Sequence, residues 1–225
     1  MARVLILKMG TTEPVIVEKH GDYESWFRHQ LRALGCSVDV CSVFSGSDLP
    51  VDTEVDGILL TGSPLSVRDE ARWMGEVGQW VIAQASLGTP VLGVCFGHQL
   101  LGELLGGRVD ENPQGPEWGA VEVDLTEAGR TDPLFHALPS TMWVQASHRD
   151  VLVSSSPQLA VLAKNTNTAV QAFGWGASLR GVQFHPELDA VVLRDLLAER
   201  GLAGLFVQSE HGRQILSNWV NHWLR

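Results

Sequence analysis

The first half of the chain alternates short apolar runs with longer stretches in which apolar residues recur at helical spacing. A short apolar run is typical of a buried strand, and a stripe of apolar residues at helical spacing is typical of an amphipathic helix. This pattern predicts strands at 3–9, 37–44, 57–60 and 90–94, and helices at 72–87 and 96–105. Trp73, Val77, Trp80 and Val81 are expected on the buried side of the first of these helices.

The pattern changes after residue 115 to segments in which apolar and polar residues alternate. We expect strands in the segments 116–125, 142–154, 159–166, 168–175 and 178–185. Their alternation and the turn at 165–167 predict antiparallel hairpins. Helices are expected at 191–200 and 212–224, packed on the sheet. Together these elements predict an α/β fold, a three-layer sandwich with a mostly parallel central sheet plus antiparallel hairpins.

Composition limits the organisation and the partners of the chain. With 225 residues, 44% of them hydrophobic, and no recognisable linker, we expect one domain over 1–225. A formal net charge of −10 argues against binding to nucleic acid or to an anionic membrane. The three cysteines form no disulfide framework, which favours the reducing cytoplasm. No signal peptide is expected, and no apolar run has membrane-spanning length.

Cys95 occupies the junction between the predicted strand at 90–94 and the helix that follows. At such a turn the first free N–H groups of the helix favour a thiolate over a thiol. Gly93 and Gly97 leave room for the tight turn, as the glycines do at the nucleophile elbow of serine hydrolases. The alternative is a small buried side chain without chemistry, which is the usual role of a free cysteine.

The segment GVQFHPE, at 181–187, supplies the partners that a nucleophilic cysteine needs. Pro186 ends the predicted strand. On an extended backbone, side chains two residues apart project to the same side, so Glu187 can orient the imidazole of His185. A cysteine, a histidine and a carboxylate are the minimum set for acyl transfer through a thiol.

Three motifs in this order resemble the class I (triad-type) glutamine amidotransferases: TGSP at 61–64, GVCFGHQ at 93–99 and FHPE at 184–187. The chain is most similar to stand-alone proteins that resemble the amidotransferase domain of GMP synthase, and it is also similar to the γ-glutamyl peptidases of plants. The resemblance covers essentially the whole chain. It implies a catalytic triad of Cys95, His185 and Glu187, with no cofactor and no metal.

The resemblance also implies an oxyanion hole and a set of substrate contacts. The backbone N–H groups of Ser63 and Phe96 are the expected oxyanion donors, although many relatives have glycine in place of Ser63. The substrate contacts that it implies are Gly62, Gln99, Ser147 and His148. The segment ASHRD resembles an SHGD segment of the family, in which Arg149 here replaces a glycine.

Two further regions carry weaker expectations. His98 is expected to be structural. The segment 10–27 is long for a loop, and its GDYESWF run resembles a family segment that borders the site. Taken residue by residue, the same segment predicts that Asp22 is a helix N-cap and that Trp26 and Phe27 pack on the core.

Three functions remain open at this point. The protein can be a glutaminase that releases ammonia from glutamine for a separate synthetase or ligase. It can be a stand-alone γ-glutamyl peptidase or hydrolase acting on a small γ-glutamyl compound. The third possibility is a non-catalytic regulatory relative, which an intact triad argues against. The amidotransferase function is favoured.

Overall fold

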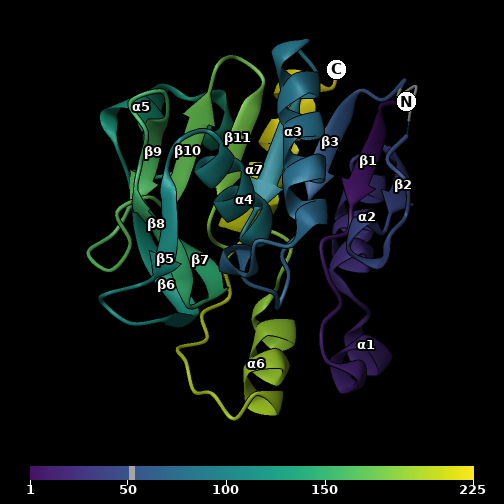
Figure 1. Ribbon diagram of the computed structural model, residues 1–225. Coiled ribbons are helices and arrows are strands. Elements are labelled where there is room, and N and C mark those ends of the chain that lie inside the picture. The colour runs from purple at the N-terminus through teal and green to yellow at the C-terminus, as the bar shows by residue number, and fades with distance from the viewer. Residues whose placement is uncertain (51–53) are drawn as a thin grey trace.

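A mixed α/β sheet forms the centre of the protein in the computed structural model, which describes residues 1–50 and 54–225 (Figure 1). Within these residues the main sheet has nine strands. In spatial order they are β2 (Ser37–Cys41), β1 (Arg3–Leu7), β3 (Gly57–Leu60), β4 (Val91–Val94), β11 (Leu179–Val182), β10 (Ala172–Trp175), β9 (Ala160–Lys164), β6 (Glu117–Leu125) and β7 (Thr141–His148).

The strands from β2 to β11 are parallel to their neighbours, and the strands from β11 to β7 pair antiparallel. A small antiparallel sheet of β5 (Arg108–Glu111) and β8 (Asp150–Ser154) lies beside the main one. The prediction of an α/β fold with a mostly parallel central sheet and antiparallel additions is confirmed.

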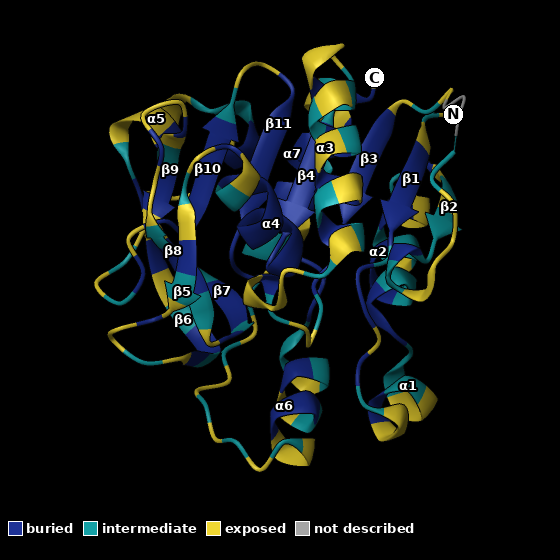
Figure 2. Ribbon diagram, viewed as in Figure 1, coloured by how far each residue is buried: buried dark blue, intermediate teal, exposed yellow. Residues whose placement is uncertain are grey.

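Helices cover both faces of the parallel part of the sheet. The helices α3 (Arg72–Ser86) and α4 (Phe96–Leu104) lie on one face, and α2 (Tyr23–Ala33) and α7 (His211–Trp223) lie on the other (Figure 1). An apolar core lies on each face of the sheet, and alternate residues of β1 belong to one or the other. Val4 and Ile6 pack with α2 and α7, and Leu5 and Leu7 pack with α3. This division follows from the pleat, which sends successive side chains to opposite faces. The inner strands β3 and β4 are accordingly buried on both sides, whereas the edge strand β2 is partly exposed (Figure 2).

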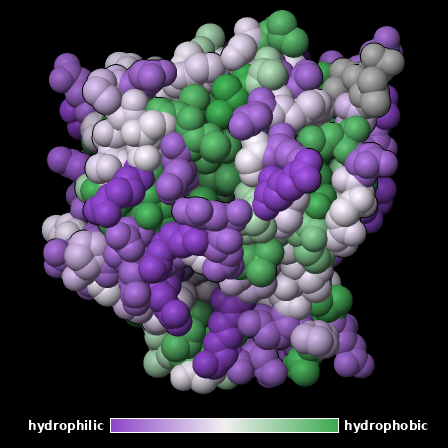
Figure 3. All heavy atoms as spheres, viewed as in Figure 1, coloured by the Kyte–Doolittle hydropathy of each residue, from purple (hydrophilic) through white to green (hydrophobic). Residues whose placement is uncertain are grey.

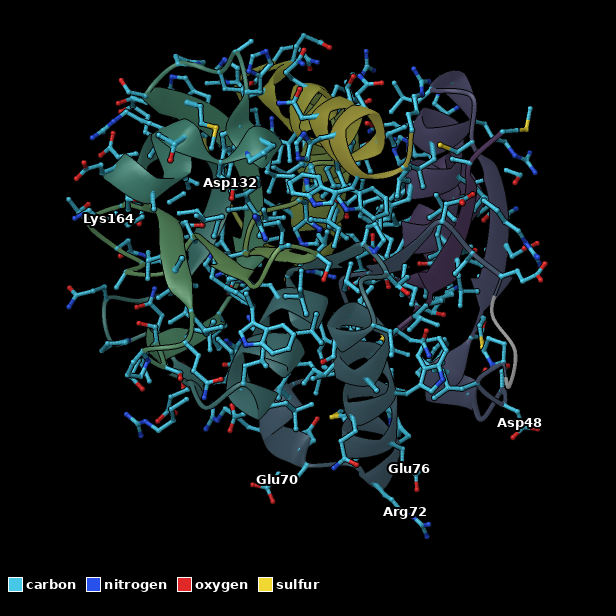
Figure 4. All side chains as sticks on the ribbon, turned by 90° about the horizontal axis from the view of Figure 1, so that it is seen from above. Asp48, Glu70, Arg72, Glu76, Asp132 and Lys164 are labelled. Carbon is cyan, nitrogen blue, oxygen red and sulfur yellow. The ribbon has the colours of Figure 1, made fainter. Side chains whose placement is uncertain are left out.

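The burial of side chains in α3 agrees only in part with the prediction. Its buried face consists of Met74, Val77, Gly78, Val81 and Ala85. Trp73 and Trp80 were expected on this face, but they are only half-buried at its margin. On the outer side Arg72 and Glu76 point away from the body of the protein (Figure 4) and form an ion pair of 2.7 Å.

Two helices depart from the expected arrangement. The segment expected to be a long loop contains α1 (Pro14–His20), with proline in its first turn. The helix α6 (Ala190–Glu199) packs on the sheet as expected, but only at the strands β6 and β7, and it also contacts α1 (Figure 1). The residues of this separate layer form their own apolar cluster: Ile16, Tyr23, Trp26, Leu188, Leu193, Leu196 and Leu197.

Shorter elements complete the chain. They are α5 (Glu127–Thr131) and the 3₁₀ turns η1 (Val43–Ser45), η2 (Val67–Asp69) and η3 (Pro133–Phe135). The strand predicted over 37–44 ends at Cys41 because the chain turns into η1. Cys36 is buried as expected, whereas Cys41 is only half-buried. In the part of the chain that the structure describes, no helix is both long and apolar enough to cross a membrane.

The face seen in Figure 3 has hydrophilic and hydrophobic regions over different strands. Hydrophilic residues form a band over β5 and β8, and a hydrophobic area lies over β10 and β11. Arg68 of η2 pairs with Asp110 of β5 at 3.7 Å and with Asp150 of β8 at 3.5 Å.

Candidate functional site

Cys95 lies at the sharp turn between β4 and α4 that the sequence predicts. Its backbone has φ 50° and ψ −100°, a conformation that residues other than glycine rarely adopt. The Cys95 N–H donates to the carbonyl oxygen of Val182 at 2.9 Å, which ties the turn to β11. Such a turn holds the side chain at the carboxyl edge of the sheet, where open α/β folds bind their ligands.

Gly93 and Gly97 allow this turn through close packing. A Cβ atom on Gly93 would lie 2.8 Å from the carbonyl oxygen of Gly97, and one on Gly97 would lie 2.6 Å from Cβ of Leu60. Neither position has space for a side chain. The expectation that these glycines relieve crowding at the turn is therefore confirmed.

His185 and Glu187 follow the end of β11 and lie against each other. The distance from Nδ1 of His185 to Oε1 of Glu187 is 2.7 Å, and both side chains are almost fully buried. The His185 N–H donates to the carbonyl oxygen of Gln145 at 2.8 Å. The pair forms as predicted, although β11 itself already ends at Val182.

The electrostatic setting of His185 favours its charged form. Burial opposes the imidazolium, but the Glu187 carboxylate and the negative charge of the Cys95 sulfur outweigh burial and raise the pKa of His185 to about 10. A protonated ring beside the sulfur can stabilise a thiolate and later supply a proton. The charge of the Cys95 sulfur thus acts on the ring of His185, although the two residues follow separate strands of the sheet.

The ring of His185 is also held from its sides. Tyr23, at the start of α2, stacks on it with ring centroids 6.3 Å apart and an angle of 24° between the planes. A Cβ on Gly62 would lie 2.7 Å from Cε1 of His185, so the TGSP loop packs directly on the imidazole. Gly62 was expected to contact the substrate; this role stays a prediction, and its observed neighbours are the rings of His185 and Tyr23.

Cys95 opens into a cavity of about 410 Å³. Its other walls include Ser63, Gln99, Ser147 and His148, four of the residues predicted for the site. Phe96 turns its ring away from the cavity and stacks on Trp73 at 6.1 Å, which leaves only its backbone for the expected oxyanion role. A cavity of this size lies within the range of small-molecule sites.

Gln99 is fixed by the protein at one end of its side chain. Its Nε2 group donates to the carbonyl oxygen of Asp150 at 2.6 Å and to Oε1 of Gln183 at 3.2 Å. These bonds hold the amide at the cavity wall in a defined orientation. The predicted contact between Gln99 and substrate stays a prediction.

Ser147 and His148 have different surroundings. Ser147 Oγ accepts a hydrogen bond from Nη1 of Arg200 at 3.1 Å. The His148 side chain is 1% exposed, and its Nε2 lies 3.2 Å from Oε2 of Glu117. Burial would raise the pKa of Glu117, but His148, Thr168 and Asn165 lower it below its usual range. The ring of His148 therefore belongs to a buried polar network, which leaves its backbone as the part suited to contact a ligand.

His98, next to Gln99, is structural as expected. Its ring is fully buried and lies 4.8 Å from the ring of Phe173. Burial lowers the pKa of His98 to about 3, so the ring is neutral.

Asp22 and the residues after it also follow the expectation. The Asp22 side chain accepts from the N–H of Tyr23 and forms a capping box with Ser25. Phe27 is fully buried in the core beneath α2, and Trp26 packs with α6 in the separate layer.

Sequence reasoning did not single out an ion pair that lies in the cavity wall. Glu13 precedes α1 and Arg200 follows α6, and they form an ion pair with Nε–Oε1 at 2.7 Å and Nη2–Oε2 at 3.2 Å. They are 187 positions apart in the chain, and no local motif marks either one. Among the described residues no group of histidine, cysteine, aspartate and glutamate has the arrangement of a metal site.

Comparison with known proteins places this geometry in context. A family model described as glutamine amidotransferase class-I matches residues 15–200. The glutamine-hydrolyzing GMP synthase of Aeropyrum pernix is 30% identical over 211 residues, which are 92% of this chain and 35% of that protein. The chain thus spans about a third of the length of that relative. In Halobacterium salinarum, a protein named as one subunit of a glutamine-hydrolyzing GMP synthase is 31% identical over 79% of this chain and 90% of its own length.

Solved structures share the fold. A glutamine amidotransferase from Methylobacillus flagellatus superimposes with a TM-score of 0.79 at 19% identity, covering all of this chain and 96% of that one. A glutamine amidotransferase from Thermotoga maritima gives a TM-score of 0.78 at 19% identity, covering 100% and 98% of the two chains.

Proposed function

The chain belongs to the class I glutamine amidotransferase family, and we propose that it hydrolyses the side-chain amide of glutamine through a thioester on Cys95. The observation that carries this proposal is the buried contact of 2.7 Å between His185 and Glu187, beside the sulfur of Cys95 at the cavity wall. The three side chains have the roles of nucleophile, acid–base and orienting carboxylate.

In the first half of the reaction, the Cys95 thiolate attacks the amide carbon of the substrate. The carbonyl electrons move to oxygen, and the tetrahedral intermediate collapses to a thioester as His185 donates its proton to the leaving nitrogen, which departs as ammonia. Neutral His185 then takes a proton from water, and the resulting hydroxide attacks the thioester. Collapse of this second intermediate releases glutamate and restores the thiolate beside a protonated His185.

Glu187 acts through His185. Its hydrogen bond at Nδ1 fixes the ring so that Nε2 is the nitrogen free to serve the sulfur and the substrate. The negative charge on Glu187 also stabilises the imidazolium of the starting state.

The oxyanion is assigned to the backbone N–H groups of Phe96 and Ser63. Phe96 is the first residue of α4, so its N–H is free of helical hydrogen bonding, and Ser63 lies on the cavity wall in the loop after β3. Fixed donors are valuable because they need no rearrangement when charge develops, and the loss of one typically costs about 10²- to 10³-fold in rate.

The ammonia is proposed to pass to a separate acceptor enzyme. The similar protein of H. salinarum is named as one subunit of a larger enzyme, and the A. pernix relative has further chain beyond the matched part. By analogy this chain would supply ammonia to a synthetase or ligase partner, and the one domain expected over 1–225 would be its glutaminase component.

A γ-glutamyl peptidase or hydrolase is the second candidate function, and the shape of the cavity supports it. The wall continues from Cys95 past Arg149 and Asp150 to Leu65, which is 41% exposed, so the cavity reaches solvent. A leaving group larger than ammonia can therefore extend outward. The attack and the thioester are the same for both substrates.

The deciding experiment measures glutamate release by the purified protein from L-glutamine and from a γ-glutamyl dipeptide, with the Cys95→Ala variant in parallel. Turnover of glutamine that requires Cys95 is the expected result, and turnover of the dipeptide alone would favour the peptidase. If Cys95→Ala retained wild-type activity, the proposed mechanism would be wrong. An increase in glutaminase rate on adding a candidate synthetase would identify the acceptor.

A further inference from the structure

The ion pair of Glu13 and Arg200 occupies the same cavity as Cys95 but has no part in the chemistry proposed above. Its two residues belong to the ends of α1 and α6, two helices that pack on each other. The apolar cluster of this layer anchors both helices. The layer therefore brings one carboxylate and one guanidinium to the cavity wall.

We propose that this ion pair binds the free α-amino-acid end of the substrate, with Glu13 accepting from the α-ammonium group and Arg200 donating to the α-carboxylate. The assignment deepens the proposed function and rests on it, because it takes the substrate to be glutamine or a γ-glutamyl compound. It defines the substrate class as one with both α groups unblocked.

Hydrogen-bonding capacity remains on both partners. Arg200 uses Nε and Nη2 for Glu13 and Nη1 for Ser147, so each Nη nitrogen keeps a second N–H. Oε2 of Glu13 accepts from Arg200 and from Oγ1 of Thr12, whereas Oε1 accepts from Arg200. The lone pair that remains on Oε1 suits an ammonium group, and the free N–H groups suit a carboxylate.

Burial and charge balance support the same assignment. The side chains of Arg200 and Glu13 are 20% and 30% exposed, so a ligand meets them in a setting that screens charge less than water does. A zwitterionic head group adds one charge of each sign to a pair that is already neutral. The four charges can then alternate in sign around the cavity wall, and no net charge is buried.

The rigid surroundings of Arg200 give the head group a fixed position. Ser147 holds the guanidinium from β7, and the buried Tyr23 lies near enough to Arg200 to affect its pKa. Tyr23 in turn stacks on His185. The proposed head-group site and the catalytic histidine therefore share one supporting side chain.

The experiment compares ligands that lack one α group in turn. Binding of L-glutamine, N-acetyl-L-glutamine and L-glutaminamide to the inactive Cys95→Ala protein is measured by calorimetry, alone and with Arg200→Gln or Glu13→Gln added. N-acetylation removes the ammonium group, and L-glutaminamide has an amide in place of the α-carboxylate. The matched controls are Arg194→Gln and Glu18→Gln, exposed residues on the same two helices.

The expected result is a crossed pattern. Arg200→Gln should weaken L-glutamine binding by roughly 10²-fold. It should affect L-glutaminamide little, since that ligand has no α-carboxylate to contact Arg200. Glu13→Gln should weaken L-glutamine similarly and affect N-acetyl-L-glutamine little. Kinetics of the two variants with Cys95 intact should show the loss mainly in KM. The controls should match the parent protein.

Several results would overturn the proposal. An equal loss for all three ligands would show a purely structural ion pair, as would no loss for any of them. Absence of L-glutamine binding to the Cys95→Ala protein would also contradict it. The proposed function fails separately: wild-type protein without glutaminase activity, combined with the crossed binding pattern, would disprove the hydrolysis and leave the head-group site intact.

Discussion

At the scale of single residues, the turn that carries Cys95 depends on the absence of two side chains. A Cβ on Gly97 would lie 2.6 Å from Cβ and 3.0 Å from the carbonyl oxygen of Leu60, in the neighbouring strand β3. Because Leu60 is fully buried, neither partner can move aside without disturbing the core. The position thus links the geometry of the nucleophile to the packing of the sheet.

Gly97→Ala is expected to reduce both stability and activity. Overpacking of this kind costs about 1–3 kcal/mol in the free energy of unfolding, and a shift of α4 would move the Phe96 N–H away from the oxyanion. The control is Gly75→Ala in α3, where a Cβ would have no heavy atom within 4 Å. This control should gain roughly 0.5–1 kcal/mol, as alanine favours a helix over glycine. Urea denaturation and glutaminase assays of both variants check the prediction, and equal stabilities would contradict it.

Glu187→Gln should lower the pKa of His185 and narrow the pH range of activity. His185 is protonated below its pKa, which the negative charges of Glu187 and Cys95 raise to about 10 against the effect of burial. Without the Glu187 charge, the effect of burial, which lowers the pKa of His185, is less compensated. The ring therefore loses its proton at a lower pH. The alkaline limb of kcat/KM should move to lower pH, and kcat should fall by about 10²- to 10⁴-fold.

This change is measured by NMR titration of the His185 ring nitrogens and by pH–rate profiles of the two proteins. Glu199→Gln, an exposed carboxylate near the end of α6, serves as the control and should leave both measurements unchanged. A His185 ring that titrates at the same pH with and without the Glu187 charge would show that the carboxylate does not control its protonation.

At the scale of elements, α6 is held by contacts with α1 as well as with the strands β6 and β7. Leu193 is fully buried in the cluster between these helices, and Arg200 follows the end of the same helix. The position of the guanidinium is therefore set by packing one to two turns away.

Leu193→Ala is expected to loosen α6 and weaken glutamine binding. A buried leucine replaced by alanine costs about 2–5 kcal/mol. Because α6 is not covered by the main core, much of this loss should appear as faster amide hydrogen exchange in residues 190–200 and as a higher KM. Val191→Ala, at a position 49% exposed on the same helix, is the control. Unchanged exchange in α6 of the Leu193→Ala protein would show that the contact with α1 is not what holds the helix.

At the scale of the whole molecule, the sheet order joins distant parts of the chain. The strand β11 lies between β4 and β10, so the final strand completes a sheet whose parallel half is otherwise built from the first 94 residues. Figure 1 shows the N- and C-termini at the same end of the molecule. The two halves of the sequence are thus parts of one hydrogen-bonded structure.

We therefore expect the single domain proposed over 1–225 to unfold as one unit. Urea transitions followed by far-UV circular dichroism and by tryptophan fluorescence should coincide, since each of the two main apolar clusters contains residues from both halves of the sheet. The eight tryptophans report on several regions of the chain. Two separated transitions would contradict this prediction and indicate independent folding units.

Local patterns in the sequence were sufficient for much of the fold and for the contact between His185 and Glu187. Apolar runs predicted β1, β3 and β4 because these strands are buried on both faces, so that consecutive residues have to be apolar. The junction at Cys95 and the pair of His185 and Glu187 were also predictable, because short spacing determines which of these side chains can meet.

The tertiary structure alone decided the layer of α1 and α6 and the residues that it brings to the cavity. A seven-residue helix such as α1 has too few turns for a clear periodic signal, and the partners of α6 lie far away in the sequence. Glu13 meets Arg200, and His148 turns inward to Glu117, only through packing of distant segments. Hydrophobic spacing reports which side of an element is buried; the identity of its neighbour depends on how the whole chain packs.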